Sequence, residues 1–125
     1  MNISKFTQKS VQAVQDLEKV AYEYGNQEIE EEHLLYALLT QEDSLILKLI
    51  EKMEIQKEYF IDTVKKALDA RVKVSGGELR FGQYLNKALV SAEDEAKAMG
   101  DEYVSVEHLF LSMLKNPSPS MKKIF

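Results

Sequence analysis

The sequence has no cysteine and no tryptophan, and it contains only two prolines and five glycines among 125 residues. The lack of cysteine excludes disulfides, thiolate nucleophiles and cysteine-ligated metals. So little proline and glycine argues against a long disordered tract and against an all-β fold that is dense in turns. The length fits one domain, which is large enough to bury a core without covalent cross-links.

Clustered positive charge and long apolar runs are missing as well. The formal net charge is −5, and the 16 lysines and arginines are scattered among 21 acids. This argues against nucleic acid and membrane partners, because both need clustered cations. No apolar run approaches the length of about 20 residues that crosses a bilayer, and the N-terminus lacks the apolar core of a signal peptide. We therefore expect a cytoplasmic protein.

Motifs of catalysis are also absent. A P-loop needs Gly-Lys-Ser/Thr, whereas Gly76-Gly77 is followed by Glu78. His33 and His108 each stand alone on a predicted helix, so a packed or hydrogen-bonded imidazole is the simpler interpretation than a metal ligand. The sequence therefore predicts no metal, nucleotide or catalytic site in these residues, and this chain is not expected to be an enzyme.

What the sequence does contain is an internal repeat. Residues 6–39 align with residues 81–114 at an offset of 75 without a gap, and 10 of 34 positions are identical, where composition alone gives roughly two. The identical pairs are Phe6/Phe81, Gln8/Gln83, Ala13/Ala88, Glu18/Glu93, Ala21/Ala96, Gly25/Gly100, Glu32/Glu107, His33/His108, Leu34/Leu109 and Leu39/Leu114. A duplicated unit explains these matches.

Both copies show helical periodicity. Apolar residues at spacings of three and four predict helices over 6–24 and 81–99, each ending at a glycine that suits a left-handed cap. Second helices are predicted at about 30–40 and 105–115, with Ser105 as an N-cap and three glutamates, 30 to 32, at the positive end of the dipole. Further helices are predicted from Leu45 to about Glu51, from about Gln56 to Arg71, and from Ser118-Pro119 onward.

These elements predict an all-α fold made of two four-helix repeats. The first repeat covers about 3–71, a Gly-Gly-containing linker covers about 72–79, and the second repeat covers about 80–125. The second copy is truncated at its third helix, because the fourth helix of the first copy has no counterpart. We expect the chain to be a fragment, or its last helix to be poorly supported.

The segments 26–30 and 32–39, with their echo at 100–105 and 107–109, resemble the Clp N-terminal repeat. Asn26-Gln27 and the linker 72–76 resemble the ClpB branch rather than ClpC or ClpA. The resemblance covers nearly all of residues 3–125. It implies a pseudo-two-fold fold that precedes two ATPase rings in an AAA+ motor.

The resemblance also implies partners. The domain would engage unfolded or aggregated polypeptide, with the motor's own ATPase rings and a co-chaperone system as further partners. The parent would be a homohexamer and the isolated domain a monomer. ATP and magnesium would bind the parent chain, outside these residues.

Polar site residues are carried over from the family by motif. They are Thr7, Asp101 and Glu107, which the family ties to substrate handling. Each also has a simpler structural interpretation: Thr7 as a cap of backbone donors, Asp101 as a turn residue, and Glu107 as a partner of the helix dipole.

Apolar site residues follow from the repeat itself. A shallow groove where the copies meet would accept apolar polypeptide segments without reading their sequence. The first and fifth helices supply matching faces, so we expect Val11, Val14, Leu85 and Leu89 to line it.

Other functions remain open at this level. One is an adaptor-docking domain of a ClpC-type unfoldase, another is a free-standing helical scaffold, and a third is a small helical enzyme. Two Walker motifs and a coiled-coil insertion downstream would select the ClpB-type interpretation.

Overall fold

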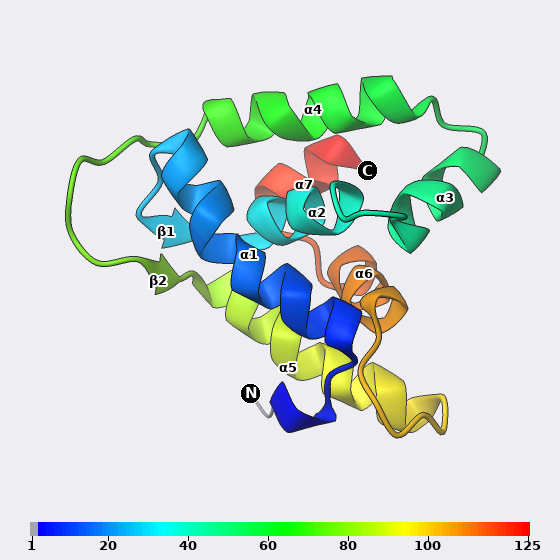
Figure 1. Ribbon diagram of the computed structural model, residues 1–125. Coiled ribbons are helices and arrows are strands. Elements are labelled where there is room, and N and C mark those ends of the chain that lie inside the picture. Colours follow the sequence, from blue (N-terminus) through cyan, green and yellow to red (C-terminus); the bar gives the residue numbers. More distant parts are fainter. Residues whose placement is uncertain (1–2) are drawn as a thin grey trace.

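The fold was determined as a computed structural model, and the structure describes residues 3–125. A 3₁₀ turn at Ile3–Lys5 (η1) precedes the first α-helix (Figure 1). The α-helices are α1 (Gln8–Tyr24), α2 (Glu31–Leu39), α3 (Leu45–Lys52), α4 (Lys57–Asp69), α5 (Gln83–Ala98), α6 (Val106–Lys115) and α7 (Pro119–Ile124). Each lies where the periodicity predicted a helix, so the all-α fold class is confirmed.

The duplication is visible in how the first helix of each copy ends. Gly25 and Gly100 have φ angles of 69° and 72°, a left-handed conformation that glycine adopts without a Cβ penalty. Beyond them, the N–H of Asn26 donates to the carbonyl of Ala21 (2.9 Å), and that of Asp101 donates to Ala96 (2.8 Å). The same cap therefore ends α1 and α5, as the sequence predicted.

Short parallel pairings, which the sequence did not predict, join the two copies. Strand β1 (Glu28–Ile29) pairs with β2 (Arg80–Phe81), with Ile29 opposite Phe81. An isolated bridge joins Phe6 to Val104. At the offset of 75, Ile29 corresponds to Val104 and Phe6 corresponds to Phe81. The two pairings are therefore equivalent under the pseudo-two-fold symmetry of the repeats. Two residues are too few to show the alternation that identifies a strand.

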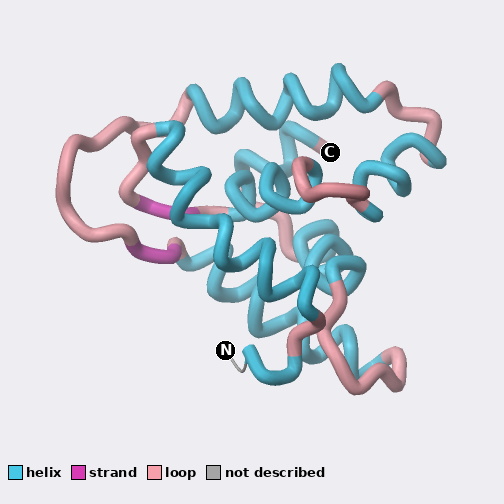
Figure 2. The backbone as a smooth tube through the Cα atoms, viewed as in Figure 1, coloured by secondary structure: helices cyan, strands magenta, loops and turns pink. Residues whose placement is uncertain are grey.

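Packing also crosses between the copies. Helix α3 packs on α6, and α7 packs on α2, so the third helix of each copy contacts the second helix of the other. Helix α2 lies at the centre of this arrangement, with α4 across it and α7 beside it (Figure 1). A loop connects α4 to β2 and bulges away from the helices (Figure 2). One continuous apolar cluster draws on both copies and includes Leu17, Leu38, Leu89 and Leu109.

The two first helices are capped by different chemistry. Thr7 is the N-cap of α1, and its hydroxyl accepts the N–H of Ser10 at 3.2 Å. The matching residue before α5 is Gly82, which has no side chain to offer. The buried carboxylate of Glu30 fills this role from the other copy, since its Oε1 accepts the N–H of Leu85 at 2.7 Å. Glu30 thus caps α5, beyond the dipole role that the sequence predicted for it on α2.

Gly82→Ala is expected to destabilise the domain. A Cβ at Gly82 would lie 2.6 Å from Oε2 of Glu30, so the added methyl displaces the capping carboxylate. We expect a loss of about 1–3 kcal/mol in the free energy of unfolding, measured by urea denaturation. In a Glu30→Ala background the same change should cost less, because the obstructing group is gone. Strict additivity of the two substitutions would contradict this account.

Candidate functional site

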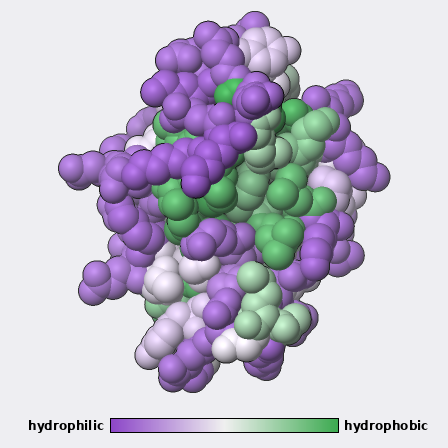
Figure 3. All heavy atoms as spheres, turned by 90° about the vertical axis from the view of Figure 1, so that its right-hand side faces the viewer, coloured by the Kyte–Doolittle hydropathy of each residue, from purple (hydrophilic) through white to green (hydrophobic). Residues whose placement is uncertain are grey.

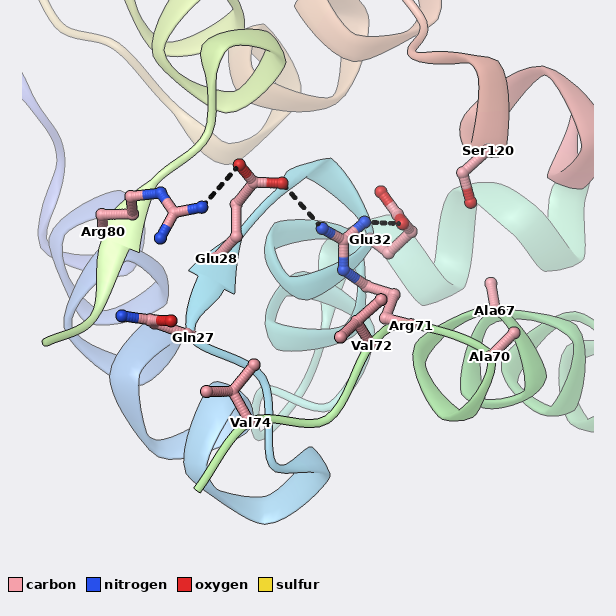
Figure 4. Close-up of a pocket in the computed structure, with 10 residues that line it drawn as sticks. All are labelled: Gln27, Glu28, Glu32, Ala67, Ala70, Arg71, Val72, Val74, Arg80 and Ser120. Atoms are coloured by element: carbon pink, nitrogen blue, oxygen red, sulfur yellow. Dashed lines mark hydrogen bonds and ion pairs between the residues drawn. The ribbon is translucent and has the colours of Figure 1, made fainter. Parts of the chain in front are cut away.

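Two hollows lie beside the two pairings that join the copies. The larger has a volume of about 570 Å³ and adjoins β1 and β2 (Figure 4). Its walls are formed by Gln27, Glu28, Glu32, Ala67, Ala70, Arg71, Val72, Val74, Arg80 and Ser120. The smaller, of about 260 Å³, adjoins the Phe6–Val104 bridge. It is lined by Lys5, Glu93, Ala96, Lys97, Asp101, Glu102 and Val104.

An ion-pair chain forms the charged wall of the larger hollow. Arg71 points between two carboxylates, with Nη1 at 2.8 Å from Glu32 Oε2 and Nη2 at 3.1 Å from Glu28 Oε1 (Figure 4). Arg80 approaches the other oxygen of Glu28 at 3.6 Å. Glu32 is fully buried, and its Oε1 has no hydrogen-bond partner among residues 3–125. A buried charge of this kind is tolerated only when it is paired, so Arg71 is the group that keeps Glu32 in place.

The three consecutive glutamates are all buried, although acids at a helix start are expected to be exposed. Glu30 caps α5 and Glu32 binds Arg71. Glu31 reaches α7, where its Oε1 accepts the N–H of Ser118 at 2.7 Å. Burial raises the pKa of Glu31 to about 7, against the stabilising hydrogen bond from Ser118, and Glu30 and Glu32 add smaller repulsions. Burial also raises the pKa of Glu30.

The two histidines hold the loops that precede α2 and α6. His33 Nδ1 accepts the N–H of Glu30 and its Nε2 contacts Asn26 Oδ1, both at 2.9 Å. His108 repeats the arrangement with the N–H of Ser105 and with Asp101 Oδ2, again at 2.9 Å. These bonds confirm the structural interpretation of the repeated histidines.

Burial first, and the Arg71 charge second, lower the pKa of His33 to about 4, so its imidazole is neutral near pH 7. In the part of the chain that the structure describes, no three His, Asp or Glu side chains converge on a metal position.

The structure brings two of the polar site candidates to one end of the molecule. Thr7, half-buried, donates its backbone N–H to Val104 (3.0 Å), in the turn that follows Asp101. Asp101 lines the smaller hollow and exposes half of its side chain while accepting from His108. Glu107 is exposed in the first turn of α6. The predicted capping role of Thr7 is confirmed, whereas partner contact by these three residues stays a prediction.

The apolar candidates divide into two groups. Leu85 and Leu89 are 0% and 1% exposed and belong to the core. Val11 and Val14 are half-buried and pack against the core from α1. None of the four lines either hollow. Of the four, only the two valines reach the surface and could contact a partner.

A further apolar surface is formed by elements other than α1 and α5. Figure 3 shows hydrophobic atoms gathered in the middle of the face that carries α3, α6 and the end of α7. Exposed apolar side chains from these elements are Leu45, Leu114 and Phe125. The sequence did not single them out, because helical periodicity does not separate an exposed apolar position from a core position.

Comparison with known proteins places this arrangement in a family. The Clp repeat (R) N-terminal domain matches residues 5–125, and the chain belongs to that family. The chaperone protein ClpB of Nitratidesulfovibrio vulgaris is 39% identical over 97% of this chain, and that of Clostridium tetani is 39% identical over 99%. The chain spans about 15% of the length of each of these relatives.

Solved structures share the fold. The N-terminal domain of Hsp104 from Candida albicans superimposes with a TM-score of 0.85 at 22% identity, covering 97% of this chain and 79% of that one. The ClpV N-domain in complex with a VipB peptide superimposes with a TM-score of 0.77 at 19% identity, covering 98% and 78%. None of the helices in residues 3–125 is long and apolar enough to cross a membrane.

Arg71→Ala is expected to destabilise the domain by about 3 kcal/mol, because it leaves the Glu32 carboxylate buried without its cation. Arg80→Ala is the matched control, since Arg80 is 62% exposed and its contact with Glu28 is longer. We expect the control to change stability by less than about 1 kcal/mol. Urea denaturation of both variants makes the comparison, and equal losses would contradict a special role for Arg71.

Proposed function

We propose that this chain is the polypeptide-recognition domain of a ClpB-type chaperone that disaggregates proteins with ATP, and that it binds unfolded or aggregated polypeptide. The observation that carries the proposal is membership of the Clp N-terminal domain family, together with near-complete coverage of this chain by ClpB relatives. The ClpV N-domain in complex with a VipB peptide supports it, because that protein holds a peptide on the same fold.

The binding surface we propose runs along the exposed side of α1 to the 101–104 turn. It comprises Thr7, Val11 and Val14, with Asp101 and Glu107 at its edge. The half-buried valines offer apolar contact, and the polar groups offer hydrogen bonds to an extended chain. Such a shallow surface buries little area, so we expect dissociation constants in the micromolar to millimolar range.

The remaining activities belong to the rest of the parent protein, because the chain spans only about 15% of its relatives. ATP and magnesium would bind there, in a cytoplasmic homohexamer whose ATPase rings act on the polypeptide passed to them. A co-chaperone system would be a further partner. The two relatives named above are both ClpB chaperones, which favours this assignment over a ClpC-type adaptor-docking domain.

The proposal predicts that Val14→Asp weakens binding of a permanently unfolded polypeptide such as casein about tenfold, equivalent to about 1.4 kcal/mol. A charge at this half-buried position removes apolar contact area and must be desolvated on binding. Fluorescence anisotropy of labelled casein measures the affinity.

Val90→Asp is the matched control, because Val90 is an exposed valine of α5. It should leave the affinity unchanged. NMR shift mapping should perturb Thr7, Val11 and the 101–104 turn. Perturbations confined to the loop 72–80, or equal effects of the two aspartates, would refute the proposed surface.

A further inference from the structure

Glu31 makes a buried contact that joins two distant parts of the chain. It is the first residue of α2, its side chain is 0% exposed, and its Oε1 accepts the N–H of Ser118, 87 positions away. Ser118 is the N-cap of α7, so the carboxylate lies at the start of that helix. The other oxygen, Oε2, has no hydrogen-bond partner among residues 3–125.

Among residues 3–125, no cation forms an ion pair with this carboxylate. On its own helix the charged neighbours are Glu30 and Glu32, both acids. From the loop after α4, Arg71 is engaged by Glu28 and Glu32. An ionised Glu31 is therefore a buried charge whose hydrogen bonds come from Ser118 and which has two like-charged neighbours, and the cost of burial outweighs the hydrogen bonds and favours the protonated form.

Among residues 3–125, the groups that shift the pKa of Glu31 belong to Glu30, Glu32 and Ser118. Helix α7 presents the Ser118 amide and hydroxyl to Glu31, while its Lys122 and Lys123 are exposed. His33, two positions further along α2, is held neutral because burial lowers its pKa to about 4. Helix α5 presents backbone amides, and these are taken by Glu30.

We propose that the Glu31–Ser118 contact is a pH-sensitive switch that controls how firmly α7 is docked on α2 and α4. When α7 lifts away, Glu31 becomes hydrated and ionises easily; when α7 docks, the carboxyl is dry and prefers its proton. Alkaline pH therefore favours the lifted state, and acidic pH favours the docked state.

The direction and size of the pH effect on docking follow from the difference in the pKa of Glu31 between the docked and the lifted state. Burial raises the pKa of Glu31 from 4.5 in water to about 7 with α7 docked, so docking binds a proton. The stabilisation of the docked state is complete below pH 4.5 and is lost as pH rises through 7. Between pH 6 and pH 8.5 the equilibrium constant for lifting α7 should increase about tenfold.

Lifting α7 would change the apolar surface of the domain. Met121 of α7 is fully buried, and the ring of Phe125 stacks on Phe60 of α4 with centroids 6.4 Å apart. Lifting α7 would expose Met121 and separate Phe125 from Phe60, and it would uncover apolar parts of α2 and α4. The switch thus regulates how much hydrophobic surface this end of the domain presents.

The second repeat provides an internal control. At the offset of 75, Val106 stands where the first repeat has Glu31, and α3 packs on α6 as α7 packs on α2. The docking of α3 therefore involves no carboxyl at the position equivalent to Glu31. Glu31→Val places at position 31 the residue that the second repeat has at position 106.

Hydrogen exchange of the 125-residue chain tests the proposal. Protection of the Lys122 and Phe125 amides, corrected for intrinsic rates, should fall about tenfold from pH 6 to pH 8.5. The change should vanish in Glu31→Gln and in Glu31→Val. It should persist in Glu58→Gln, a matched variant of an exposed glutamate on α4. Amides of α3 should show the same pH response in the wild-type chain and in Glu31→Gln.

Two results would overturn the proposal. One is an equal pH response of the α7 amides in the wild-type chain and in Glu31→Gln, including the absence of a response in both. The other comes from the wild-type chain alone and so does not depend on how the variants fold: a ¹³C-carboxyl resonance of Glu31 that titrates at the ordinary glutamate value.

Discussion

The fold depends on an exchange of polar contacts between two copies of one helical unit. Each copy offers the segment before its second helix to the segment before the first helix of the other, which produces the Ile29–Phe81 and Phe6–Val104 pairings. Buried backbone groups must find partners, and here they find them across the repeat boundary. Each copy satisfies part of its loops internally, through His33 and His108, and the remaining backbone groups pair with the other copy.

The pseudo-symmetric positions have diverged in chemistry while keeping their geometry. A threonine caps α1 from within, whereas α5 is capped by Glu30 from the other copy over a glycine that leaves it room. Where one copy has Val106, the other has a buried carboxyl at Glu31. The two copies thus share one backbone arrangement but differ in their side chains. At the start of α2, Glu30 caps α5, Glu32 pairs with Arg71, and Glu31 binds the N-cap of α7.

Local features of the fold could be predicted from the sequence. Helix positions, the glycine caps at Gly25 and Gly100, and the structural histidines follow from spacing and residue type within a few turns of the chain. The roles of Glu30 and Glu31 could not be predicted, because their partners lie 54 to 87 positions away and acids at a helix start are normally solvated.

The candidate site was less predictable than the fold. The residue types that line a shallow groove are the same as those that fill a core, so periodicity assigned Leu85 and Leu89 to a groove although they are buried. Thr7 and Asp101 were site candidates only through the family resemblance, and the Phe6–Val104 bridge, which the sequence did not predict, explains why they lie at the same end of the molecule.

The central claim is that the two repeats form one interlocked folding unit. Native-state hydrogen exchange in low denaturant tests it most directly, by following buried amides of both copies, such as Leu17 and Leu38 in the first and Leu89 and Leu109 in the second. Interlocking predicts that all four exchange with a single free energy, equal to that of global unfolding. Exchange of one repeat at a lower free energy, while the other stays protected, would contradict it.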